Sequence, residues 1–339
     1  MSKRKEELMS LKKIAEMVGV SPSTVSRVLN NTVPNCASTE LKEKIWEAAH
    51  ALQYVPNTEA RNLKMGKWET AKTYKIAVIL TRFGFLDKDP FFRELFQSIE
   101  EALLERSCIL QMVTNAEEVD FSALDEIDGI IILGRCSDAF LTRLKHDTRN
   151  IVGVDRNPTD YKMDEIICNG KTAAVKAMEY LLSLGHQKIG YIGDCSFEAR
   201  YVGYCETLIK QNIPINYHYI QSTDQTYESG YQAMMELRKQ DMTAVFCAND
   251  ITALGAMQAL TDSASQKKEK KRAVSVIAID NIAGAMTSTP LLTTVDIPKE
   301  EMGRMAVTVL LDRISHKHSE YLRVEFPCRV IERESCFRL

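Results

Sequence analysis

Polar side chains follow the apolar runs of the chain beyond residue 75, and their types favour ligand binding over catalysis. Carboxylate and amide oxygens accept hydrogen bonds, which suits a ligand rich in hydroxyl groups, such as a sugar. A single Asp in such a place is often only a helix cap, whereas several that converge on one edge indicate a binding site. These polar groups are Thr81-Arg82, Asp155-Arg156, Asp194, Asn249-Asp250 and Asp280-Asn281.

The sequence lacks the common signatures of catalysis and of cofactor binding. It contains no Gly-x-Gly-x-x-Gly, no Walker loop and no Gly-x-Ser-x-Gly, and a sugar-acting enzyme would need an acid/base pair or an activated nucleophile. Nine cysteines are scattered without a Cys-x-x-Cys, and the close histidine pair, His316 and His318, has no partner ligands nearby in the sequence. We therefore expect no enzymatic activity, no cofactor, no metal and reduced thiols.

Short apolar runs alternate with amphipathic stretches after residue 75, and this alternation predicts the fold that positions the polar groups. Uninterrupted β-branched runs separated by helices are typical of a parallel sheet covered on both faces. Two such sets in succession predict two doubly wound lobes, with a ligand cleft at the carboxyl ends of the strands. The expected strands span residues 75–80, 108–113, 129–133, 151–154, 188–192, 244–247 and 274–279.

A second pattern, near the N-terminus, predicts a helix-turn-helix. Apolar residues at positions 11, 14, 15 and 18 share one helix face, and Gly19 can supply a tight turn. Ser21 is then the N-cap of a second helix, and Pro22 takes its first position. In this motif the second helix enters the major groove of DNA.

Small or basic side chains lie on the expected outer face of this second helix. They would let the helix approach the base edges, and Arg27 can reach a base or a phosphate. The alternative is an ordinary helical hairpin with solvated polar faces. The residues expected to contact DNA are Pro22, Ser23, Thr24, Ser26 and Arg27.

The charge of the chain is unevenly distributed. Its 339 residues carry 43 Lys and Arg against 46 Asp and Glu, but residues 1–67 hold eleven basic residues against seven acidic ones. A basic head on an acidic body is expected of a nucleic-acid-binding module joined to a unit with another task. No apolar run approaches the roughly 20 residues that span a bilayer, and the N-terminus lacks the apolar segment of a signal peptide. We expect a cytoplasmic protein without membrane segments.

Residues 10–66 resemble the DNA-binding head of the LacI/GalR family of bacterial repressors. The matching segments are Val18-Gly19-Val20-Ser21, Thr24 to Asn30, and Tyr54-Val55-Pro56-Asn57 with Ala60 and Leu63. The resemblance implies a helix-turn-helix head over residues 1–56, a hinge helix over 57–66, a linker over 67–74 and an effector-binding and dimerisation core over 75–339. It also implies that Asn57, Ala60 and Leu63 of the hinge contact DNA, with Leu63 as an apolar wedge in the minor groove.

The core resembles the effector-binding unit of the same family, which has a type I periplasmic-binding-protein-like fold. The segments that carry this resemblance are Arg200-x-x-Gly203-Tyr204, Ala248-Asn249-Asp250 and Ile279-Asp280-Asn281. The implied fold class is multi-domain: an all-α head and an α/β core of two doubly wound parallel-sheet lobes. The first lobe is expected over about 75–162 and 297–325, and the second over about 163–296 and 326–339.

The resemblance also implies the effector contacts. Arg200 and Asp280 are expected to orient a pyranose ring together, because Arg offers a fixed fork of donors and Asp accepts two hydrogen bonds. Asp250 is expected to cap the helix that follows it. The full set of implied effector contacts is Thr81, Asp155, Arg200, Asn249 and Asp280.

A sugar-responsive transcriptional repressor of a carbohydrate operon, bound to operator DNA, is the function that the resemblance implies. The segments 154–158 and 295–303 look most similar to regulators of galactoside use, whereas Asn169 and Asp296-Ile297-Pro298 depart from the family pattern. The chain ends at Leu339 without the leucine-heptad tail that makes the lactose repressor a tetramer, so a homodimer is expected. The alternative is a sugar-acting α/β enzyme with an appended DNA-binding head.

Overall fold

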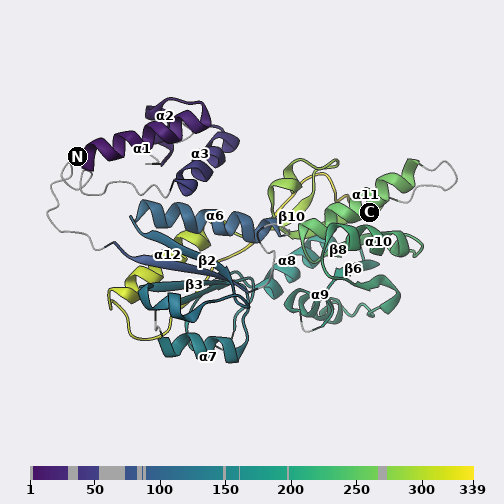
Figure 1. The fold of residues 1–339 in the computed structure, drawn as a ribbon. Coiled ribbons are helices and arrows are strands. Elements are labelled where there is room, and N and C mark those ends of the chain that lie inside the picture. Colours follow the sequence, from purple (N-terminus) through teal and green to yellow (C-terminus); the bar gives the residue numbers. More distant parts are fainter. Residues whose placement is uncertain are drawn as a thin grey trace.

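The computed structural model consists of a small helical head and two α/β lobes that lie side by side (Figure 1). It describes residues 3–29, 37–52, 73–81, 86, 89–147, 150–159, 161–196, 198–265 and 273–339. The expected hinge residues Asn57, Ala60 and Leu63 lie outside these ranges, as does most of the expected linker over 67–74. No helix in these ranges is long and apolar enough to cross a membrane.

The head contains α1 (Lys3–Val18), α2 (Pro22–Leu29) and α3 (Thr39–Ala51). Gly19 has φ +74°, a left-handed conformation that glycine adopts without a steric penalty. The backbone N–H of Thr24 donates to the Ser21 hydroxyl at 3.1 Å, so the turn and the cap predicted from the sequence are confirmed. The small core of the head is formed by Ile14, Val25, Val28, Leu29 and Ile45, all buried.

The first lobe is built on a sheet with strand order β11-β5-β4-β3-β1-β2, whose neighbouring strands are all parallel. Helices α6 (Pro90–Glu105) and α12 (Lys299–Ile314) pack together, and α7 (Asp138–Asp147) belongs to the same lobe. The strands are β1 (Lys75–Leu80), β2 (Ile109–Asn115), β3 (Gly129–Leu133), β4 (Ile151–Asp155), β5 (Asp164–Ile167) and β11 (Arg323–Glu325).

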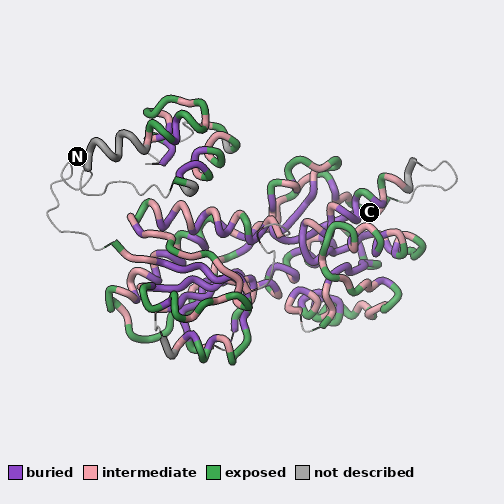
Figure 2. Tube along the Cα trace, viewed as in Figure 1, coloured by how far each residue is buried: buried purple, intermediate pink, exposed green. Residues whose placement is uncertain are grey.

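The second lobe repeats this plan with strand order β12-β10-β9-β8-β6-β7, and β12 is antiparallel to β10. The central strands of both sheets are buried between their helices (Figure 2). The strands are β6 (Ile189–Gly193), β7 (Ile220–Ser222), β8 (Ala244–Cys247), β9 (Ser275–Asp280), β10 (Thr293–Asp296) and β12 (Arg329–Ile331), and the helices are α8 (Gly170–Ser183), α9 (Ala199–Lys210), α10 (Tyr227–Leu237) and α11 (Asp250–Ser265).

All seven strands expected from the sequence are present, within one or two residues of their predicted bounds. The prediction missed five strands of three or four residues: β5, β7, β10, β11 and β12. Two of them read Arg-Val-Glu and Arg-Val-Ile. Such short segments hold too few apolar residues for a recognisable alternation of apolar and polar positions. Three of the five, β7, β11 and β12, are edge strands, whereas β5 and β10 each lie one place in from an edge.

The chain passes between the lobes three times: between β5 and α8, between β10 and α12, and between β11 and β12. The boundary expected at residues 162/163 is therefore placed too early, because β5 pairs with β4 and belongs to the first sheet. The first crossing falls at Cys168 and Asn169. Asn169 accepts hydrogen bonds from the backbone of α8 and acts as its N-cap.

Two glycines bring α10 and α11 into close contact, which places the loops that enter both helices. A Cβ atom on Gly255 would lie 1.9 Å from the carbonyl oxygen of Tyr227, and one on Gly230 would lie 2.2 Å from that of Thr252. No side chain fits at these distances, so the helix backbones can approach as they do only with glycine at both positions. The N-terminus of α11 and the turn before α10 thereby contribute residues to the same strand-end region.

Candidate functional site

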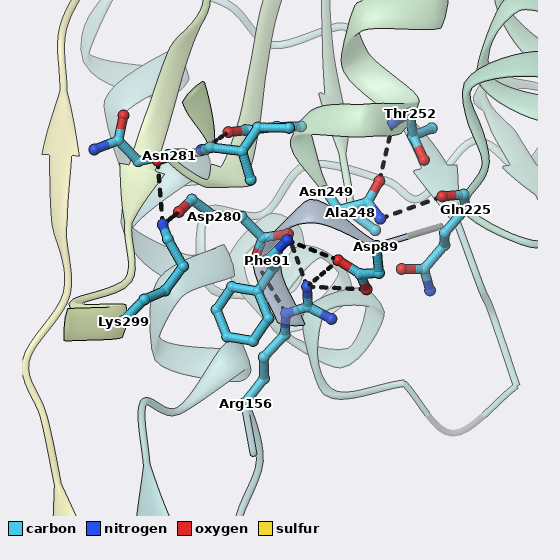
Figure 3. Close-up of polar contacts among 12 residues, drawn as sticks. Asp89, Phe91, Arg156, Gln225, Ala248, Asn249, Thr252, Asp280, Asn281 and Lys299 are labelled. Atoms are coloured by element: carbon cyan, nitrogen blue, oxygen red, sulfur yellow. Dashed lines mark hydrogen bonds and ion pairs between the residues drawn. The ribbon is translucent and has the colours of Figure 1, made fainter. Parts of the chain in front are cut away.

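An ion pair joins the two lobes where the central strands of both sheets end. Arg156 follows β4 of the first lobe, and Asp280 is the last residue of β9 in the second. The guanidinium donates from Nε to Oδ1 of Asp280 at 3.0 Å and from Nη2 to Oδ2 at 2.9 Å, as Figure 3 shows. This bidentate geometry is the strongest form of an Arg–carboxylate contact.

A second carboxylate and an aromatic ring complete the surroundings of Arg156. Asp89 is the N-cap of α6, and its Oδ2 lies 3.4 Å from Nη2 of Arg156. The ring of Phe91 lies against the guanidinium, with 3.9 Å between Cζ and the ring centroid (Figure 3). Burial by itself lowers the pKa of Arg156, but the charges of Asp280 and Asp89 outweigh it and raise the pKa above its ordinary value.

The backbone at Asp280 adopts an uncommon conformation that neighbouring groups stabilise. Asp280 has φ +124° and Asn281 φ +50°, values that side-chain-bearing residues adopt rarely and mostly at functional sites. The Lys299 ammonium at the start of α12 donates to the carbonyl oxygens of both residues and lies 3.3 Å from the Glu94 carboxylate. Burial raises the pKa of Asp280 to about 6, although the charge of Arg156 opposes this shift.

Arg200 has its partners within the second lobe. It donates to the carbonyl oxygen of Ala248 at 2.7 Å and to Oε1 of Gln225 at 2.9 Å, and its Nε lies 2.9 Å from Glu198. Both Asp280 oxygens accept hydrogen bonds from Arg156 in this structure, and the expectation that Arg200 and Asp280 orient a ligand together stays a prediction.

The helix cap expected at Asp250 is instead supplied by Asn249. The Asn249 amide oxygen accepts from the backbone N–H of Thr252 at 3.0 Å, so Asn249 caps α11. Its amide nitrogen donates to the Gln225 carbonyl at 3.2 Å. The prediction that Asp250 is the cap is wrong, because its carboxyl group accepts from the Ile282 N–H and the Thr294 hydroxyl at 2.9 and 2.6 Å.

Thr81 and Asp155 lie at the carboxyl edge of the first sheet. Leu80 pairs with Leu133, and Leu133 with Val154, so the residues that follow these strands end side by side. The Thr81 hydroxyl is buried and has no hydrogen-bond partner in the described part of the chain. Asp155 is half-buried, and one of its oxygens accepts from the backbone N–H of Arg156 at 2.6 Å.

Sequence reasoning named Arg156 among the strand-end polar groups but not among the effector contacts, and it missed Asp89 and Gln225. Arg156 was visible as a cation at a strand end, next to Asp155. Asp89 precedes Pro90, and Asp followed by Pro is a signal for a helix N-cap. Gln225 lies in a turn with φ +63°, and no sequence pattern points to it.

The DNA-binding side chains expected on α2 lie on an accessible surface of the head. Pro22, Ser23 and Arg27 are exposed, and Thr24 and Ser26 are half-buried. The Ser21 hydroxyl lies 2.7 Å from that of Ser23 and 2.8 Å from that of Thr24. The N-terminus of α2 thus presents a short row of hydroxyl groups, with Arg27 one turn further along.

A helix-turn-helix head joined to a two-lobed core with a polar site between its lobes defines the class of ligand-responsive DNA-binding regulators. Residues 10–57 match the family of bacterial regulatory proteins, lacI family, and residues 178–336 match a periplasmic binding protein-like domain. The chain belongs to the lacI family and is a DNA-binding transcriptional repressor with an effector-binding core. This family is not enzymatic, so the interpretation as a sugar-acting enzyme is set aside.

Relatives of known name or structure cover between 78% and 96% of the chain. The HTH-type transcriptional repressor PurR of Photorhabdus laumondii is 32% identical over 345 residues, which cover 96% of both chains. A transcriptional regulator CelR–cellobiose complex has a TM-score of 0.68 at 26% identity, with 96% of this chain and 99% of that chain covered. A LacI family regulator from Enterococcus faecium with bound ribose has a TM-score of 0.67 at 28% identity. The match covers 78% of this chain and 99% of that chain.

Proposed function

We propose that this repressor is controlled by a neutral sugar, bound between the lobes near Asp280, and that galactosides are the first candidates. The observation that carries this proposal is the charge of the strand-end cluster. Three buried cations of the site each lie beside a carboxylate: Arg156 beside Asp280, Arg200 beside Glu198 and Lys299 beside Glu94.

This pairing favours a ligand without charge. An anionic ligand, such as a uronate or a sugar phosphate, would need a cation that is not already neutralised, and it would meet the carboxylates of Asp89, Asp155 and Asp280. Hydroxyl groups can instead donate to these carboxylates and accept from the Thr81 hydroxyl, which has no partner within the described residues. The face of Phe91 is covered by Arg156, so it is not available to stack on a planar base.

Two further observations support a sugar as the effector. The segments 154–158 and 295–303 resemble those of regulators of galactoside use. Two of the similar solved structures hold sugars, cellobiose in one and ribose in the other. For the effector contacts we propose Thr81, Asp155, Arg200, Asn249 and Asp280.

On the DNA side, we propose that the protein acts in the cytoplasm as a homodimer on operator DNA. Contacts to bases and phosphates would come from the exposed face of α2, with Arg27 as the principal side chain. The hinge residues Asn57, Ala60 and Leu63 would contact the minor groove.

A ligand panel tests the effector proposal. The full-length protein is titrated with D-galactose, lactose, cellobiose, ribose, hypoxanthine and D-galacturonate, while its melting temperature and operator affinity are recorded. We expect a neutral sugar, with a galactoside foremost, to raise the melting temperature and change operator affinity, and to be recovered chemically unchanged. A response to hypoxanthine or to galacturonate alone would contradict the proposal.

A further inference from the structure

We propose that Arg156 is a latch between the lobes, which holds the cleft closed without effector and moves from Asp280 to Asp89 when an effector binds. This inference rests on the proposed function in one respect, namely that the effector hydroxyl groups bind Asp280. It adds a mechanism: the effector competes with a side chain of the protein for the same carboxylate.

The latch spans the lobes and is desolvated at both ends. The exposed fraction of the side chain is 9% for Arg156 and 3% for Asp280, and 124 residues separate them in the chain. Because water is largely excluded, the attraction between the two charges is stronger than on the surface. Separating the lobes would break this contact and leave the buried Asp280 carboxylate without its partner, so the ion pair favours the closed arrangement.

Two carboxylates compete for this one guanidinium. Nη2 of Arg156 lies 2.9 Å from Oδ2 of Asp280 and 3.4 Å from Oδ2 of Asp89. Asp89 lies in the same lobe as Arg156, at the start of α6. Arg156 can therefore release Asp280 and remain ion-paired, because its second partner moves with it when the lobes separate.

The surroundings of Arg156 support an exchange between these partners. The Phe91 ring lies on one face of the guanidinium, with Phe92 at 5.1 Å, so the cation keeps an aromatic contact in either position. The Lys299 ammonium donates a hydrogen bond to the carbonyl oxygen of Asp280. This contact holds the Asp280 backbone in place and so limits the direction of the Asp280 carboxylate. In the proposed exchange, hydroxyl donors of the sugar take the places of the two Arg156 N–H donors at the Asp280 oxygens.

The latch itself is tested without any ligand, by single-molecule fluorescence energy transfer in the full-length protein. Dyes are attached through encoded azide side chains at the exposed positions Ala139 in α7 and Gln240 after α10. We expect one closed population in the wild type and in Asp89→Asn, and a more separated population in Arg156→Met. Arg156→Lys, which keeps the charge but lacks the fork, should lie between them. An Arg156→Met distribution equal to that of the wild type would overturn the latch.

The competition with effector is tested by calorimetric titration with D-galactose. Arg156→Met should bind the sugar about tenfold more tightly, since the binding-competent state is no longer depleted by the latch. Asp89→Asn should bind it more weakly, because Arg156 loses the partner that allows its release, while Asn still caps α6. General damage to the site would weaken both variants, so a loss of affinity in both would overturn the competition.

The two arms separate failure of this inference from failure of the proposed function. If the wild type binds no neutral sugar, the proposed effector class is wrong, and the ligand-free fluorescence measurement still decides whether Arg156 closes the cleft. If Arg156→Met does not fold, the Arg156→Lys distribution decides: a closed population identical to the wild type contradicts the latch.

Discussion

Asp250 and Asp280 are buried carboxyl groups at the strand ends of the second lobe, and burial raises the pKa of both. That of Asp250 rises to about 8, because repulsion from Asp280 adds to the effect of burial and outweighs its hydrogen bonds to Thr294 and Ile282. That of Asp280 rises to about 6, where Arg156 limits the shift. Burial and repulsion thus favour protonation of Asp250, whereas the charge of Arg156 favours the ionised form of Asp280.

We predict that Asp250→Asn removes a pH dependence from the stability of the core. Unfolding returns Asp250 to its ordinary pKa, so the folded state binds more protons between about pH 4 and 8, and stability falls as pH rises through this window. Asn satisfies both partners, as it can accept from the Ile282 N–H and donate to the Thr294 hydroxyl. The free energy of unfolding is measured with urea at pH 6 and at pH 9. Between these pH values, that of the variant should rise by about 1–3 kcal/mol relative to that of the wild type. If the free energies of unfolding of the two proteins differ by the same amount at both pH values, the raised pKa of Asp250 is contradicted.

At the scale of elements, α2 is positioned by features within a short segment. Ser21 caps it, Gly19 turns the chain before it, and Val25, Val28 and Leu29 bury its inner face. Its outer face keeps Pro22, Ser23 and Arg27 exposed. Since the inner face is fully used for packing, substitutions on the outer face should change DNA binding without changing the fold of the head.

Arg27→Ala should weaken operator binding by about 1–3 kcal/mol if the guanidinium makes a bidentate base contact. The loss should be much larger on operator than on random DNA, as fluorescence anisotropy at fixed salt would show. Arg27→Lys is the matched control: it preserves a phosphate contact but not a bidentate base contact. If the lysine variant binds operator as the wild type does, Arg27 contacts a phosphate; if the alanine variant does, α2 has been assigned the wrong role.

At the scale of the whole molecule, the chain crosses three times between the lobes whose strand ends bring Arg156 to Asp280, and the head precedes the first lobe in the sequence. An effector can change operator affinity only if it binds the two lobe arrangements with different affinity. Coupling energies between such sites are commonly about 1–3 kcal/mol. The ion pair between the lobes is one contact that distinguishes the two arrangements.

We predict that Asp280→Asn abolishes the change in operator affinity that the sugar causes in the wild type. The substitution preserves volume but replaces an acceptor oxygen with a donor, which opposes a ligand hydroxyl at a buried position. Operator titrations with and without the sugar, in both proteins, measure the coupling directly. Asp241→Asn is a suitable control, because it changes an exposed carboxylate just before β8, at the opposite edge of the same sheet. A wild-type response in Asp280→Asn would show that the cleft has been assigned wrongly.

The sequence by itself determined the features that depend on neighbouring residues. The turn at Gly19, the cap at Ser21 and the seven long strands arise from local periodicity and backbone preferences, which are complete within ten to twenty residues. Because the carboxyl ends of parallel strands share one edge, the sequence also placed Asp155, Asn249 and Asp280 at strand ends. It did not reveal five short strands, β5, β7, β10, β11 and β12, each of which pairs with a longer strand or with another short one.

Only the tertiary structure decided which of these strand-end groups bind one another. Asn249 and Asp250 are adjacent and chemically similar, and the choice of cap depends on Thr294 and Ile282, which come from distant segments. Arg156 and Asp280 lie in different lobes, so their pairing depends on three crossings that set the distance between two sheets. The spacing of residues along the chain does not reveal the distance between the two sheets. An ion pair across the cleft depends on how the two lobes pack against each other.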